Sequence, residues 1–119
     1  VIVVRRDIEN SKKEIPIKNI GKEIDILLED IQKNLFNASK VHMDSNTRHV
    51  ETMDELIDTL NNKEGFVTCY WHENKKDEKK IKELTSATIR CYPLGIEDSK
   101  KAINDENKEG SFTVFSKAY

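Results

Sequence analysis

Two stretches in the second half of the chain decide its fold: Phe66-Val-Thr-Cys-Tyr-Trp-His72 and Ala87-Thr-Ile-Arg-Cys-Tyr-Pro93. Each combines β-branched and aromatic residues and is flanked by polar or breaking residues, a pattern typical of buried strands. Between them, the lysine- and glutamate-rich residues 75–84 predict a helix. A shorter apolar run, Phe112–Phe115, predicts the last strand, so these segments indicate one sheet with a helical crossover.

The residues before Phe66 add a strand and a helix to this order. Asn46–Val50 has the composition of a short strand. Thr52-Met-Asp-Glu55 is a capping box, in which the Thr52 hydroxyl accepts the Glu55 N–H and the Glu55 carboxylate accepts the Thr52 N–H. The helix that this box opens is amphipathic through four apolar residues, Met53, Leu56, Ile57 and Leu60.

From residue 46 onward the predicted order is β-α-β-α-β-β. Ile81 and Leu84 are the expected apolar anchors of the helix between the two central strands. Residues 95–110 are polar and predict an exposed loop, with one helical turn at Glu97–Ile103. We therefore expect an α+β fold, a two-layer α/β sandwich with a four-stranded mixed sheet and its helices on one face.

The first 45 residues follow a different pattern. Val1–Val4 is a continuous β-branched run, as expected for a strand buried on both faces, and residues 8–16 predict a loop or hinge. From Lys18 to about Lys40, apolar residues recur every three or four positions and predict a long helix. A strut between domains is our interpretation of this helix, and a dimerising coil is the alternative. The expected regions are 1–16 for the strand and hinge, 17–45 for the connector helix and 46–119 for the α/β domain.

Composition narrows the class of protein. With 119 residues, of which 36% are hydrophobic, the chain supports one modest core. The formal net charge of −2 gives no argument for non-specific nucleic-acid binding, which needs a basic excess or a basic face. No apolar run approaches the roughly 18–20 residues of a membrane span. The chain begins at Val1 without Met and within a predicted strand, so we expect a fragment. It also lacks the order of residues found in signal peptides, and we expect a cytoplasmic protein.

The histidines and carboxylates offer one loose set of metal ligands. Three histidines are scattered along the chain without the spacing of helical ligands: His42, His49 and His72. Four side chains near the end of the central strand could bind a metal weakly: His72, Glu73, Asp77 and Glu78. A structural zinc site needs four Cys or His ligands, usually in close pairs. Solvated side chains are the simpler interpretation, so we expect no metal site.

The cysteines and the aromatic residues raise the questions of a nucleophile and of a stacking surface. Cys69 as a nucleophile would need a base and an activating environment, and its position in a strand predicts a buried thiol instead. Cys69 and Cys91 do not form a CxxC pair, and in the cytoplasm both are expected to be reduced. Tyr70 and Trp71 point to opposite faces of one strand, so only one of them can stack on an RNA base. We expect Trp71 in the core.

Four blocks occur in order along the chain: Val3-Val-Arg-Arg-Asp7, Leu28-Glu-Asp-Ile-Gln-Lys-Asn-Leu-Phe36, Ile81-Lys-Glu-Leu-Thr-Ser-Ala-Thr-Ile-Arg-Cys91 followed by Pro93, and Phe115-Ser-Lys-Ala-Tyr119. Together they resemble the C-terminal region of prolyl-tRNA synthetases of the eukaryote/archaeon-like type. The resemblance covers essentially the whole chain. It implies that Val1–Asp7 closes an anticodon-binding domain, that the long helix is a connector, and that the rest is a C-terminal α/β domain.

The resemblance also implies an activity for the full enzyme, a class II aminoacyl-tRNA synthetase. Such an enzyme uses ATP and Mg²⁺ to activate proline and attaches it to tRNA(Pro), and it is usually a homodimer. Its catalytic motifs lie in an upstream domain, so the fragment alone is expected to be inactive. Arg5 and Arg6 are the candidate tRNA contacts. Lys12 and Lys13, in the loop that follows, are expected to be solvated, with a phosphate contact as the alternative. A stand-alone RNA-binding or protein-interaction module with the same sandwich is the alternative.

Two further features follow from the resemblance. Many members have a four-cysteine zinc site, with one pair after the tryptophan strand and one before the last strand. The matching segments here, Trp71–Asp77 and Asn104–Gly110, contain no cysteine, so we expect zinc to be absent. The family ends on a tyrosine whose carboxylate folds back toward the synthetic active site, and Tyr119 holds that position. We therefore expect the Tyr119 carboxylate to lie near the active site of the full enzyme.

Overall fold

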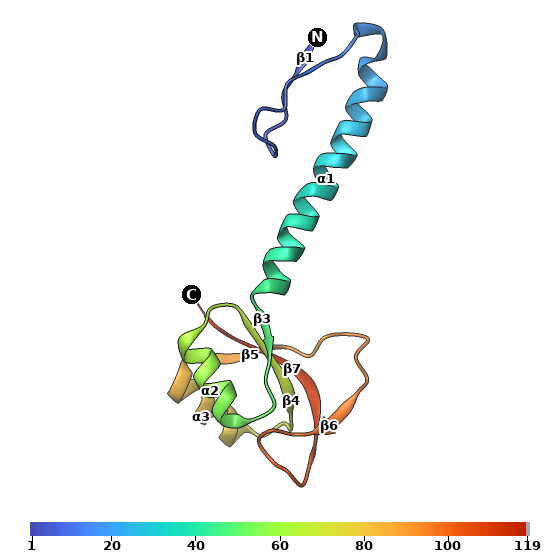
Figure 1. The fold of residues 1–119 in the computed structure, drawn as a ribbon. Helices are drawn as coiled ribbons and strands as arrows, with labels where there is room; N and C mark the ends of the chain where they lie inside the picture. Colours follow the sequence, from blue (N-terminus) through green and yellow to red (C-terminus); the bar gives the residue numbers. More distant parts are fainter. Residues whose placement is uncertain (119) are drawn as a thin grey trace. The chain divides into compact units, whose positions relative to one another are not determined.

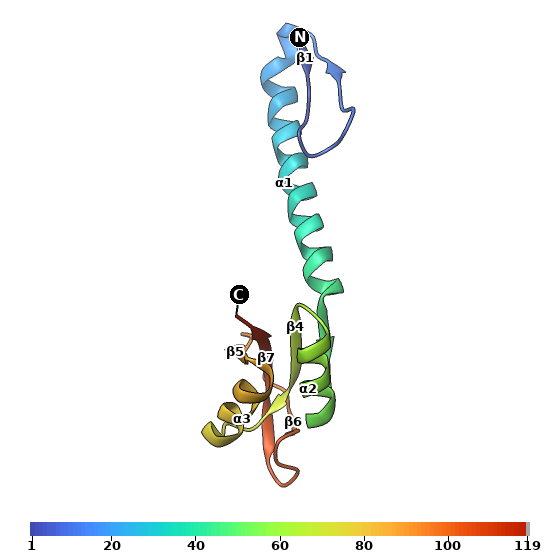
Figure 2. The same cartoon turned by 90° about the vertical axis from the view of Figure 1, so that its left-hand side faces the viewer.

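The computed structural model describes residues 1–118 (Figures 1 and 2). The chain divides into two compact units, Val1–Asp44 and a second unit that begins at Ser45. The mixture of a long helix in the first unit and a sheet with two helices in the second confirms the expected α+β class.

The first unit consists of a small hairpin and a long helix. Strand β1 (Ile2–Val3) pairs antiparallel with β2 (Lys13–Glu14), and a 3₁₀ turn, η1 (Ile17–Asn19), leads into α1 (Ile20–Ser45). The predicted helix is therefore correct and extends five residues further than its pattern. Strand β2 falls where we predicted a loop. Its two residues are both polar and exposed, so no apolar period in the sequence marks them as a strand.

Apolar side chains of the first unit are largely exposed. Val1, Ile2 and Val4 each show more than half of their surface, so nothing within the described residues buries both faces of this strand. Ile15 is buried, and its backbone pairs with Val1 through Ile15 N–H to Val1 O at 2.8 Å. Helix α1 contains no buried residue.

The second unit is a mixed sheet with two helices. Its elements are β3 (Thr47–His49), α2 (Met53–Asn62), β4 (Phe66–Trp71), α3 (Lys75–Thr85), β5 (Ala87–Cys91), β6 (Ser99–Lys101) and β7 (Glu109–Lys117). The strand order is β3-β4-β7-β5, and β6 also pairs with β7. Strands β3 and β4 are parallel, whereas β7 runs antiparallel to β4, β5 and β6.

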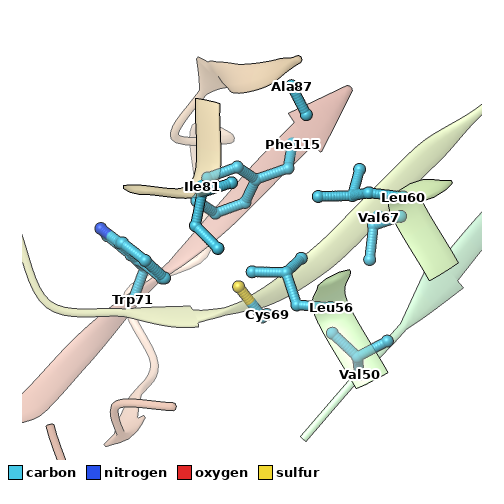
Figure 3. Close-up of a cluster of buried hydrophobic side chains, with 9 residues drawn as sticks. All are labelled: Val50, Leu56, Leu60, Val67, Cys69, Trp71, Ile81, Ala87 and Phe115. Atoms are coloured by element: carbon cyan, nitrogen blue, oxygen red, sulfur yellow. The ribbon is translucent and has the colours of Figure 1, made fainter. Parts of the chain in front are cut away.

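The core lies between one face of this sheet and the two helices, as predicted. Figure 3 shows nine buried side chains from α2, α3, the strands and the residue that follows β3: Val50, Leu56, Leu60, Val67, Cys69, Trp71, Ile81, Ala87 and Phe115. The rings of Trp71 and Phe115 meet edge to face, with their centroids 5.0 Å apart. The expectation that Trp71 lies in the core is confirmed.

The cap of α2 differs from the predicted capping box in one bond. Thr52 Oγ1 accepts the Glu55 N–H at 3.2 Å, as predicted. The Glu55 carboxylate accepts the N–H of Glu51, at 3.0 Å, instead of that of Thr52. The cap still provides acceptors for two backbone donors around the helix start, so the sequence signal located this start correctly.

Two other details of the second unit were predicted wrongly. The sheet has five strands, because Ser99–Lys101 pairs with Glu109–Ser111 where we expected a helical turn. All three residues of β6 are exposed and polar, so no apolar alternation marks them as a strand. Leu84 is half exposed and does not anchor α3. The buried residues of this helix are Ile81 and Thr85.

The position of Leu56 at the centre of the core yields the first testable expectation. Its side chain is fully buried, so Leu56→Ala should lower the free energy of unfolding by about 2–5 kcal/mol through lost packing and a new cavity. Leu84→Ala removes the same atoms from a half-exposed site and should cost less than about 1 kcal/mol. Urea unfolding followed by the fluorescence of Trp71 measures both. Equal losses in the two variants would contradict the assigned core.

Candidate functional site

Two segments that are far apart in the sequence meet at the end of β4. The Ile103 N–H donates to Tyr70 O at 2.9 Å, which places the loop between β6 and β7 beside the last residues of β4. The Asn104 side chain then continues this pairing past the strand. Its Oδ1 accepts the His72 N–H and its Nδ2 donates to His72 O, each at 2.9 Å. The amide of Asn104 therefore pairs with His72 as a neighbouring peptide group would.

Neighbouring side chains complete this junction. Asn104 Nδ2 also donates to the Asp77 carboxylate at 3.1 Å, at the start of α3. The imidazole Nδ1 of His72 lies 3.3 Å from Glu109 O, at the start of β7. Gly110 allows the close approach, because a Cβ atom there would lie 2.6 Å from Trp71 N. We call His72, Asp77 and Asn104 the amide junction.

The amide junction lies where the family resemblance would place a zinc site, and its residues do not fit one. The segments Trp71–Asp77 and Asn104–Gly110 offer no thiolate. The carboxylate of Asp77 and the imidazole of His72 are both engaged in hydrogen bonds of the junction. Within residues 1–118, no group of three or more His, Cys, Asp or Glu side chains is placed to hold a metal ion. The geometry is that of a polar cross-link.

The sheet face opposite the helices carries an aromatic cluster. The rings of His49 and Phe112 are stacked with an interplanar angle of 10°, and both meet Tyr70 edge to face. Lys100 Nζ lies 5.0 Å from the Tyr70 ring centroid. Tyr70 and Trp71 thus point to opposite faces, as predicted, but Tyr70 is buried by its neighbours and offers no free ring face for a base.

The two cysteines have different environments and are not paired. Cys69 is fully buried, and burial raises the pKa of its thiol to about 12, so it lacks the thiolate that a nucleophile needs. Cys91 is exposed. Strand β7 lies between β4 and β5, so the two cysteines do not lie on neighbouring strands, and both are free.

The candidate tRNA contacts in the first unit differ in their availability. Arg5 donates to both carboxylate oxygens of Asp7, at 2.6 and 3.0 Å, and also pairs with Asp30 of α1. The hydrogen bond from Arg5 lowers the pKa of the Asp7 carboxyl to about 2. Arg5 therefore holds its own loop against α1. Arg6 and Lys12 are exposed, and Lys13 pairs with Glu23 at 2.8 Å.

Sequence reasoning missed one residue of the amide junction and named one that lies outside the described residues. Asn104 sits in a polar loop without any motif, so only its position in space marks it. The expected role of Tyr119 falls on the one residue that the structure does not describe.

No helix within residues 1–118 is both long and apolar enough to cross a membrane.

Comparison with known proteins gives a consistent result. The family model described as prolyl-tRNA synthetase, C-terminal, matches residues 53–119, more than half of the chain. A proline–tRNA ligase of Flavobacterium johnsoniae is 34% identical over 118 residues, which are 98% of this chain and 24% of that protein. Proline–tRNA ligase 2 of Clostridioides difficile is 35% identical over 119 residues, which are 99% of this chain and 24% of that protein.

A solved structure has the same fold. The prolyl-tRNA synthetase of Cryptosporidium parvum, in complex with L-proline and AMP, aligns with a TM-score of 0.79 and 28% identity over 92% of this chain and 24% of its own. This chain spans about a quarter of the length of the relatives it matches. The order of elements, the core and these similarities agree, and the chain therefore belongs to the prolyl-tRNA synthetase family, in the region of its C-terminal domain.

Proposed function

We propose that the chain is the C-terminal part of a proline–tRNA ligase, which activates proline with ATP and Mg²⁺ and attaches it to tRNA(Pro). The observation that carries this proposal is the match of the C-terminal family model, together with proline–tRNA ligases that align over nearly the whole chain. The full enzyme is cytoplasmic and homodimeric in this proposal. The part described here does not catalyse the reaction, which belongs to an upstream class II domain.

The role of this part is to connect and support the other domains of the same enzyme. The exposed apolar residues Val1, Ile2 and Val4 support the assignment of β1 to an anticodon-binding domain, whose remaining strands would cover them. The long α1 supports the connector role, since a helix without buried residues suits a strut between domains better than a core element. A stand-alone RNA-binding module is the second candidate, and its support is limited to the exposed basic residues Arg6 and Lys12.

Expression of the complete reading frame that contains this chain tests the proposal. With proline, ATP, Mg²⁺ and tRNA(Pro), the full protein should form prolyl-tRNA, whereas the chain of 119 residues alone should form none. Acid-precipitable labelled proline on tRNA measures the reaction. Absence of class II catalytic motifs upstream of Val1, or absence of charging by a folded full-length protein, would refute the assignment and favour the stand-alone module.

The proposed role of the Tyr119 carboxylate gives a separate prediction. A hydrogen bond to a charged group contributes about 1.5–3 kcal/mol, so deletion of Tyr119 from the full enzyme should lower aminoacylation by about 10- to 100-fold. The unfolding transition of the second unit should stay unchanged. Tyr119→Phe keeps the terminal carboxylate and is the matched control, expected to retain activity. Unchanged kinetics after the deletion would exclude this role.

We further propose that the domain folds without zinc, with the amide junction as the cross-link between its two segments. Asn104→Ala removes three hydrogen bonds and should lower the free energy of unfolding by about 1–3 kcal/mol. Asn107→Ala changes an exposed amide of the same loop and should stay within about 0.5 kcal/mol. Treatment with EDTA should leave thermal unfolding unchanged. Stoichiometric zinc in the purified protein, or unfolding by EDTA, would overturn the proposal.

A further inference from the structure

The C-terminal end of β7 is held by two different elements. On one side, its last two residues pair with β5. On the other side, pairing with β4 stops at Phe115, which lies opposite Val67. Beyond that point, Ser116 Oγ donates to Gly65 O at 3.0 Å, while Lys117 O lies farther from the same hydroxyl, at 3.3 Å. Figure 1 shows the end of β7 beside the chain that joins α2 to β4.

The acceptor of this hydrogen bond lies in a turn with little freedom. Gly65 has a φ of 104°, a left-handed value that favours glycine, and a Cβ atom there would lie 2.0 Å from Asn46 O. Arg48 of β3 donates to Glu64 O at 2.9 Å, and the N–H of the residue after Gly65 donates to Asn46 O at 2.9 Å. Gly65 O is therefore a fixed point, to which Ser116 ties the end of β7.

The place of this hydrogen bond matters because β7 ends shortly before Tyr119. Lys117 is the last residue of β7, and Ala118 alone lies between it and Tyr119. Two extended residues span at most about 7 Å. The position and direction in which β7 ends therefore limit the region that Tyr119 can reach.

We propose that Ser116 is a positioning residue for prolyl-tRNA formation, because its hydrogen bond to Gly65 fixes the strand end that carries Tyr119. This inference rests on the proposed function, in which the Tyr119 carboxylate lies near the active site of the full enzyme. Pairing with β5 holds only one edge of the strand end. Removal of the hydroxyl frees the other edge, so the last residues sample more positions and the carboxylate is correctly placed for a smaller fraction of the time.

Kinetics of the full-length enzyme test this role. Ser116→Ala should lower the rate of prolyl-tRNA formation by about 2- to 10-fold, the range for one intramolecular hydrogen bond. Ser116→Thr keeps a hydroxyl and should retain activity. Ser111→Ala is the matched control and should leave the rate unchanged, because it removes the same atom from an exposed position of the same strand. A rate unaffected by Ser116→Ala would overturn the inference.

A double-mutant cycle separates positioning from stability. Because Ser116 acts through Tyr119 in this proposal, Ser116→Ala should have no further effect on charging in an enzyme that already lacks Tyr119. Equal effects with and without Tyr119 would show a purely structural role and refute the inference, while leaving the proposed function intact. A folded wild-type enzyme that forms no prolyl-tRNA would instead refute the proposed function, and this inference with it.

Hydrogen exchange in the chain of 119 residues gives a readout that does not depend on catalysis. In Ser116→Ala, the amides of Lys117 and Ala118 should exchange about threefold faster or more than in the wild-type chain, since the strand end opens more often. Ser111→Ala should leave their exchange unchanged. Equal exchange of these amides in Ser116→Ala and in the wild-type chain would contradict the proposed anchor.

Discussion

The alternation of side chains along β4 is the constraint on which the second unit depends. Val67, Cys69 and Trp71 enter the core, while Thr68 and Tyr70 lie on the opposite face. Pairing with β7 fixes this register, because Val67 lies opposite Phe115 and Cys69 opposite Thr113. A slip by one residue would move every one of these side chains to the other face. The core, the aromatic cluster and the amide junction all follow from this one register.

The end of β4 shows how the fold satisfies backbone groups once regular pairing stops. A peptide N–H or C=O that is removed from water without a partner costs free energy, so the residues after Trp71 need donors and acceptors. Asn104 supplies both to His72 from one planar amide and fixes the loop before β7 in the same step. A metal ion can join two loops of this kind, and here the amide of Asn104 makes hydrogen bonds that link them to His72 and Asp77. The cross-link is therefore part of the hydrogen-bonded sheet.

Sequence patterns predicted those parts of the fold whose residues carry apolar periods or caps. The core strand β4, the helix start at Thr52 and the long α1 were located correctly because each has a clear period or a capping residue. Strands β2 and β6 were missed, since they consist of exposed polar residues that pair only through their backbones. Asn104 was missed for a related reason, because its role depends on contacts with His72 and Asp77, which lie far earlier in the chain. Such long-range polar contacts leave no local pattern.

The distribution of apolar surface separates what this chain stabilises by itself from what it leaves to a partner. The second unit encloses its core between its sheet and its own two helices. The first unit keeps only Ile15 buried and exposes β-branched residues at Val1, Ile2 and Val4, a pattern that fits one piece of a larger sheet. Burial of the N-terminal residues by further strands would complete such a sheet.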